Sequence, residues 1–289
     1  MSVTATVGAN LAGFVESLEF DRTPFAIDMN GRPFIPVGHG GIVLGVELGD
    51  SVFGHEGDHV APGATLVHPD QAARHALTAF ACIGNEVIVR TGAAAGASGR
   101  VLGKRGEAGR VIAVFDQEVL CALAPGDSTM VRSRGQGSVL PPELANAGAI
   151  VVNIDMRLLE VLGIDFGSRL TVPVRAVVPS KLVGNGLGRP VQMWDVDLSV
   201  TAETAGRWGM PELLLGDLVC VRDLDVRHNI GYRAGWSTIG VIVHGASRLP
   251  GHGPGLTPIL CAPSDVIDLD IDDVNHRGLT ADRLGFNHG

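Results

Sequence analysis

Histidines recur in three glycine-rich loops of this sequence, each beside an apolar run that is typical of a buried strand. The loops carry His39, the pair Asp58 and His59, and His244 with His252. Loops at strand ends often carry catalytic and binding groups. We therefore expect a site where the loop of His59 meets the segment from His244 to Gly255, although the two lie far apart in the sequence.

The residue types in these loops indicate metal chemistry. Zinc and similar divalent metals bind imidazole and carboxylate groups at about 2.0–2.2 Å, and a catalytic site holds three such ligands and leaves one position for water. His59, His244 and His252 supply three imidazoles, and Asp58 adds a carboxylate. We therefore expect a divalent metal, zinc first, as the cofactor.

Two other roles for these histidines stay open. Imidazoles can donate to backbone carbonyls and hold Gly/Pro loops in shape. They can also transfer protons without a metal, with Asp58 orienting His59 and with Glu86 or Tyr232 as a second catalytic group. Glu86 stands between a helix and a strand, where burial would raise its pKa towards that of a general base. Pairing with Lys104 or an arginine would explain Glu86 equally well.

The glycine-rich loops can present backbone N–H groups to an anion, such as the carboxylate or phosphate of a small substrate. Turn formation alone explains the glycines about as well. The expected substrate contacts are His39, Tyr232, Gly253 and Gly255. A nucleotide cofactor is not expected, because Pro190 follows the loop Gly184–Gly188 and blocks the helix that a dinucleotide fingerprint requires.

The composition favours strands over helices. The chain has 289 residues with 40 glycines and 16 prolines, and only 18% of its residues are charged. This indicates many tight turns and few long amphipathic helices. The expected fold class is α+β and β-dominated, with small β-barrels and a few short helices.

The charge of the chain argues against two classes of binding partner. A net charge of −9, with no run of lysine or arginine, argues against nucleic acid and against anionic membranes. No apolar stretch approaches the ~20 residues of a membrane span, and the N-terminus has no basic region. We expect a cytoplasmic homo-oligomer with a small-molecule substrate. Its four cysteines are expected to be buried free thiols: Cys82, Cys121, Cys220 and Cys261.

The clearest helix signal covers residues 70–81, where Asp70 is a plausible N-cap and apolar residues recur at i, i+3 and i+4. Residues 99–137 show the pattern of an SH3-like small barrel. We expect a β-rich part over residues 1–140 that includes this barrel, a second β-rich part over 141–275, and a tail or arm over 276–289.

Several motifs, taken in order, resemble an uncharacterised bacterial and archaeal family, domain-of-unknown-function family 4438. They are Gly57–Gly63, Cys82–Glu86, Asn153–Asp155, Val178–Ser180, Ile239–His244 and Gly251–Gly255. The resemblance spans nearly the whole chain and implies no activity. A fainter similarity to acetamidase/formamidase-type amidases concerns only the strand-Gly-Asp-strand pattern and is an analogy at the level of fold.

These observations favour an enzyme. The expected activity is that of a hydrolase or lyase acting on a C–N or C–O bond of a small polar or anionic metabolite. In this hypothesis His59, His244 and His252 bind metal or transfer protons, and Glu86, Asp58 and His59 are the catalytic residues. The alternative is a non-catalytic metabolite-binding or scaffold protein.

Overall fold

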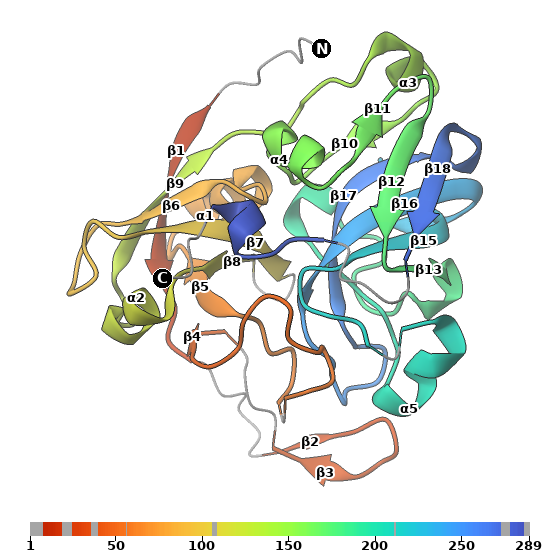
Figure 1. The fold of residues 1–289 in the computed structure, drawn as a ribbon. Helices are drawn as coiled ribbons and strands as arrows, with labels where there is room; N and C mark the ends of the chain where they lie inside the picture. Colours follow the sequence, from red (N-terminus) through yellow and green to blue (C-terminus); the bar gives the residue numbers. More distant parts are fainter. Residues whose placement is uncertain are drawn as a thin grey trace.

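The computed structural model describes residues 8–18, 25–35, 40–55, 57–105, 109–210, 212–272 and 278–285. Two β-sheets form the body, and five short α-helices lie around them in these ranges (Figure 1). The strands coloured red to yellow-green lie beside the strands coloured green to blue. The expected β-dominated α+β class is confirmed.

The first sheet closes into a barrel. Its strand order is β1-β9-β6-β7-β8-β5-β4, and an extra pairing of β1 with β5 joins the ends. Its strands are β1 (Ala9–Val15), β4 (Ile42–Val43), β5 (Gly63–Val67), β6 (Glu86–Val89), β7 (Ser98–Arg105), β8 (Arg110–Val114) and β9 (Ser128–Ser133). The small barrel predicted over residues 99–137 supplies only β7, β8 and β9. Three strands cannot close a barrel, and β1, β5 and β6 complete it.

The second sheet has the order β10-β17-β16-β15-β13, and β14 also pairs with β17. Within the described ranges its pairings leave it open. Its strands are β10 (Ile150–Val151), β13 (Ala176–Pro179), β14 (Val196–Asp197), β15 (Leu218–Asp225), β16 (Gly231–His244) and β17 (Gly255–Pro263). Two smaller sheets contain β11 (Asp165–Phe166), β12 (Leu170–Val174) and β18 (Ile267–Ile271), and β2 (Ala26–Ile27) and β3 (Pro33–Phe34).

The helices are short, as expected. They are α1 (Gln71–Phe80), α2 (Gln117–Ala122), α3 (Pro142–Asn146), α4 (Met156–Val161) and α5 (Ala202–Ala205), with 3₁₀ turns at Ser180–Leu182, Val191–Met193, Gly206–Trp208, Ser264–Val266 and Asp282–Leu284. The predicted cap of α1 is confirmed, because the Asp70 carboxylate accepts a hydrogen bond of 2.9 Å from the N–H of Ala73. Leu77 of this helix is fully buried against the barrel core.

The register of the second sheet sets the relative positions of His244, Gly255 and Asp197. The predicted strand Ile239–His244 is the buried second half of β16. In the antiparallel pairing of β16 with β17, His244 lies opposite Gly255, and Gly255 in turn lies opposite Asp197 of β14. These three residues therefore lie side by side on adjacent strands at one end of the sheet.

The two sheets share a hydrophobic core. Leu102 and Ile112 of the barrel pack in the same cluster as Val243 and Ile259 of the second sheet. The expected divisions near residues 140 and 275 stay predictions, and this cluster includes residues from all three expected parts. Leu279 in the predicted tail is fully buried in this shared cluster, so that part of the tail is docked on the body.

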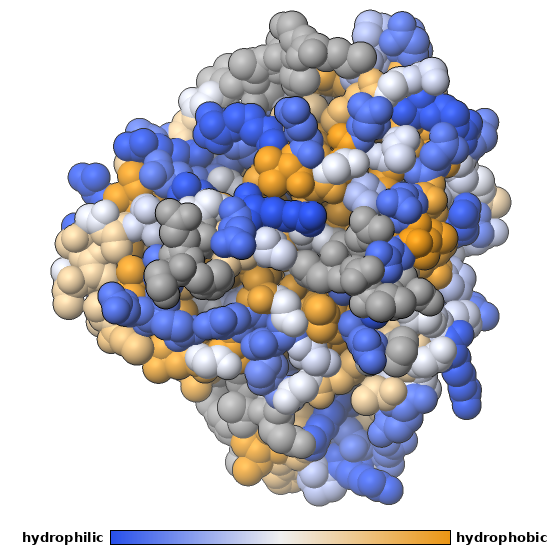
Figure 2. All heavy atoms as spheres, in the orientation of Figure 1, coloured by the Kyte–Doolittle hydropathy of each residue, from blue (hydrophilic) through white to orange (hydrophobic). Residues whose placement is uncertain are grey.

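The surface carries both polar and apolar side chains. Polar and apolar side chains alternate on the face in Figure 2, and apolar atoms reach the lower edge, where Figure 1 places the β2–β3 hairpin.

All four cysteines are described and are free, but Cys121 is exposed on α2, contrary to the expectation that all would be buried. None of the described helices is long and apolar enough to cross a membrane.

Candidate functional site

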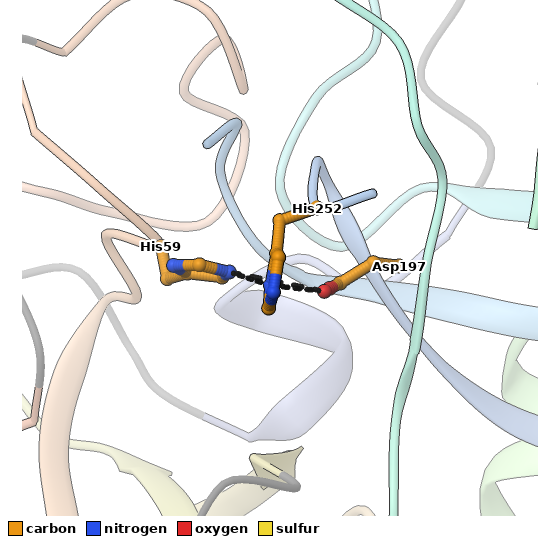
Figure 3. Close-up of side chains that lie close together, drawn as sticks. All are labelled: His59, Asp197 and His252. Atoms are coloured by element: carbon orange, nitrogen blue, oxygen red, sulfur yellow. Dashed lines mark hydrogen bonds and ion pairs between the residues drawn. The ribbon is translucent and has the colours of Figure 1, made fainter. Parts of the chain in front are cut away.

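The two histidine-bearing loops meet, as the sequence predicts. Nε2 of His59 lies 2.9 Å from Nδ1 of His252. The rings of His59 and His244 are edge to face, with centroids 5.0 Å apart. Figure 3 shows His59 and His252 converging with the carboxylate of Asp197. Three separate segments of the chain thus contribute side chains to one cluster.

The loop after residue 57 holds His59 in one orientation. Its Nδ1 lies 2.9 Å from Oδ2 of Asp58, and its backbone N–H donates to the carbonyl of Ala246. Asp58 also accepts hydrogen bonds from the Ser247 hydroxyl and the Arg248 N–H. His59 has φ of 53°, a left-handed conformation that surrounding contacts must maintain in a residue with a side chain. Because Nδ1–H donates to Asp58, Nε2 is the ring atom that faces His252 and Asp197.

Asp197 is a site residue that sequence analysis missed. Its Oδ2 lies 2.9 Å from Nδ1 of His252 and 3.8 Å from Nε2 of His59. Three ligand atoms at 2.0–2.2 Å from a shared ion lie about 3–4 Å from one another, so the three separations fit one divalent cation. The predicted metal ligands His59 and His252 therefore belong to one possible ligand set, with Asp197 as the third member.

His244, the third predicted ligand, faces a second set. Its Nε2 lies 2.8 Å from Oδ2 of Asp195 and 3.4 Å from Oδ1 of Asp197, and its Nδ1–H donates to the carbonyl of Gly245. All three side chains are buried. Asp195 directly precedes β14, and both carboxylates reach His244. Residues two apart in an extended chain point to the same face, so the Asp-Val-Asp spacing is the sequence signal that would have found this pair.

The carboxylates and imidazoles change one another's pKa values. Burial alone would lower the pKa of His244, but Asp195 and Asp197 outweigh it and raise that pKa to about 10. Burial likewise opposes charge on His59, yet hydrogen bonds with Asp197 and Asp58 raise its pKa above the ordinary value. Burial would raise the pKa of Asp197, and contacts with His244, His252 and His59 hold it well below its usual range. The nearby carboxylates thus favour the charged forms of His59 and His244.

The two glycines predicted as substrate contacts lie beside the cluster. A Cβ on Gly255 would lie 1.9 Å from Nε2 of His244, so the missing side chain leaves space for that imidazole. A Cβ on Gly253 would lie 1.8 Å from the carbonyl oxygen of Leu198, so the loop packs against the chain that follows β14. Both glycines allow close packing, and their contact with a substrate stays a prediction.

Other predicted site residues lie elsewhere. Glu86, on β6 of the barrel, forms a partly exposed ion pair with Arg132, with 3.0 Å between Oε2 and Nη1. This supports the reading in which an arginine neutralises Glu86. Tyr232 is 74% exposed and lies at the opposite end of β16 from His244. His39 lies outside the described residues.

The comparisons with known proteins agree with the resemblance seen in the sequence. The solved structure titled "Crystal structure of TM1086" has 33% sequence identity and a TM-score of 0.87, with 93% of this chain and 94% of that chain covered. No curated protein matches. The expected likeness to acetamidase/formamidase-type amidases gains no support from these findings.

Two family models account for most of the chain. Residues 25–160 match the N-terminal domain of unknown function DUF4438, and residues 162–276 match its C-terminal counterpart. The loop with Asp58 and His59 falls in the first model, whereas Asp195, Asp197 and the other histidines of the cluster fall in the second. This chain therefore belongs to the DUF4438 family, and the cluster is built from both of the family's domains.

Proposed function

We propose that this protein is a divalent-metal-dependent hydrolase or lyase that acts on a C–N or C–O bond of a small polar or anionic metabolite. The observation that carries the proposal is the convergence of Nε2 of His59, Nδ1 of His252 and Oδ2 of Asp197. Zinc is the expected metal, because two imidazoles and one carboxylate form a common catalytic zinc ligand set.

The surroundings of His59 support a ligand role. Metal-binding histidines usually donate their other ring N–H to a carboxylate or a carbonyl, which fixes the tautomer and orients the ring. Asp58 does this for His59, and Ser247 and Arg248 hold Asp58 in turn. This support is more than a loop-shaping histidine needs, since one carbonyl acceptor would satisfy it.

The site has one accessible side. The side chain of His252 is 22% exposed, whereas His59 and Asp197 are buried. Three protein ligands leave a position for water on a zinc ion, which lowers the pKa of that water to about 7 and polarises a substrate carbonyl. A water or substrate would approach beside His252, and Asp58 would keep His59 from turning away. Glu86 has no part in this scheme, because it is paired on the barrel.

Metal content and thermal stability test the proposal. Protein stripped with a chelator should melt at a higher temperature after zinc is added, because a ligand that binds only the folded state stabilises it. His252→Ala should lose most of the zinc response. His75→Ala, at an exposed histidine on α1, is the matched control and should keep it.

If zinc leaves the melting temperature of the wild-type protein unchanged, the metal-dependent proposal fails. A protein that binds zinc at His252 still has to show turnover. Hydrolysis or elimination should then be sought in a panel of small anionic amides, esters and hydroxy acids, with the stripped protein as the blank. Zinc binding with substrate analogues bound but never converted would favour the alternative, a non-catalytic metabolite-binding protein.

A further inference from the structure

We propose that the site holds two divalent ions, with Asp197 as the bridging carboxylate. The inference rests on the proposed function, which supplies the first ion at His59, His252 and Asp197. The second ion would be held by Nε2 of His244, Oδ2 of Asp195 and Oδ1 of Asp197, whose ligand atoms lie within 4.8 Å of one another.

Asp197 offers one oxygen to each set. Its Oδ2 faces His252 at 2.9 Å, and its Oδ1 faces His244 at 3.4 Å. A carboxylate that directs its two oxygens to two sets of ligands can span a pair of ions, which in two-metal sites lie about 3.5–4 Å apart. The edge-to-face contact of the His59 and His244 rings keeps the two sets adjacent.

The buried Oδ1 of Asp197 is an independent indication that this position suits a cation. The Asp197 side chain is only 4% exposed, and among the described residues its Oδ1 has no hydrogen-bond partner. The hydrogen bond of His244 Nε2 goes to Asp195 instead. Its 3.4 Å contact with Nε2 of His244 is an ion pair and not a hydrogen bond. A buried carboxylate oxygen without a hydrogen bond is costly, and an ion between Asp197, Asp195 and His244 would satisfy it.

His244 is oriented as a ligand would be. Its Nδ1–H donates to the carbonyl of Gly245, so Nε2 is the atom directed at the carboxylates. The ring has space only because Gly255, directly across the β16–β17 pairing, lacks a side chain. The second set is thus shaped by the sheet register, whereas the first is shaped by loops.

The two ions would differ in their access to solvent. The first lies beside the accessible His252, and the second lies among side chains that are at most 5% exposed. A pair of ions favours hydrolysis over elimination, because two ions can stabilise both the attacking and the departing oxygen or nitrogen. In that reaction the oxygen of water bonds to the substrate carbon, the C–N or C–O bond breaks, and a proton from the water goes to the leaving group.

Metal stoichiometry tests the inference on the full chain. The stripped protein is equilibrated with zinc alone, dialysed, and analysed for zinc per chain. The wild-type protein should hold two ions, and Asp195→Asn should hold one. Asp225→Asn is the matched control, because this carboxylate pairs with Arg227 and Arg233 away from the site, and it should hold two. With manganese in place of zinc, the wild type should give an exchange-coupled paramagnetic resonance spectrum and Asp195→Asn an uncoupled one.

The outcomes separate this inference from the proposed function. One ion per wild-type chain, lost in His252→Ala and kept in Asp195→Asn, would overturn the second ion and leave the proposed function standing. No bound ion would overturn both. If Asp195→Asn does not fold, His244→Gln replaces it, and the wild-type count of two with coupled manganese still decides the question.

Discussion

At the scale of single residues, hydrogen bonds fix the orientation of the side chains in the cluster. Asp58 accepts hydrogen bonds from His59, Ser247 and Arg248, so Nε2 is the ring atom of His59 that faces the cluster. The sequence predicted the pairing of Asp58 with His59 from their adjacency, and the hydrogen bond between them is present. It did not predict Asp195 and Asp197, because aspartate in a short polar strand is usually solvated, and only the fold shows that these two are buried against histidines.

Lys104 is a buried basic residue that lies outside the proposed ligand sets. Its ammonium group donates to Asn153 Oδ1 and to the carbonyl of Gln192, and neither acceptor carries a charge. Burial lowers the pKa of Lys104 from 10.5 to about 7, although the neighbouring Cys82 acts in the opposite direction. Sequence analysis considered Lys104 only as a partner for Glu86, which pairs with Arg132 instead.

This burial makes stability depend on pH. Between pH 7 and the pKa of an unfolded lysine, the unfolded chain binds more protons at Lys104 than the folded chain does, so the contribution of Lys104 to the free energy of unfolding should rise with pH. Relative to Lys104→Met, the wild-type protein should gain roughly 1–3 kcal/mol between pH 7 and pH 9. Urea unfolding of both proteins at pH 7, 8 and 9 measures this. Cysteines of the unfolded chain ionise at about pH 8.5 in both proteins, so the difference between the two proteins reports on Lys104. Parallel stability curves for the two proteins would contradict the prediction.

At the scale of elements, periodicity predicted the strands and helices that are long. The helix at residues 70–81 and the strand at 239–244 were found because each repeats its apolar pattern over several residues. β14 consists of Val196 and Asp197 alone, which is too short for any period. Closure of the barrel depends on β1 pairing with both β5 and β9, and no local pattern encodes pairings between distant strands.

The β16–β17 pairing gives a prediction at this scale. Gly255→Ala should displace the imidazole of His244, because the added methyl group would lie 1.9 Å from its Nε2. Overpacking of this kind costs about 1–3 kcal/mol of unfolding free energy, and the variant should also bind fewer zinc ions per chain. Gly231→Ala on β16 is the control, since its nearest neighbour would be 3.9 Å away. Equal stability and zinc content in the two variants would show that the ring does not depend on Gly255.

At the scale of the whole molecule, the two family domains and the two sheets form one packed body. The largest core cluster joins Leu102 of the barrel with Val243 of the second sheet and Leu279 of the C-terminal segment. The candidate site also requires both domains, because His59 comes from the first domain and Asp197 from the second. Composition predicted a β-rich chain, but a core shared between domains arises from tertiary contacts that composition does not specify.

A shared core predicts that the two halves unfold together. All three tryptophans, Trp194, Trp208 and Trp236, lie in the second half of the chain, so their fluorescence reports on that half, whereas far-ultraviolet circular dichroism reports on the strands of both. In urea the two signals should change with the same midpoint, because separating the halves would expose the cluster around Leu102 and Val243 to water. Leu279→Ala should lower both midpoints equally, with a loss of about 2–5 kcal/mol. A variant in which fluorescence changes at lower urea than the dichroism would show that the second domain unfolds by itself, and the cluster of His59 and Asp197 would then be lost before the barrel.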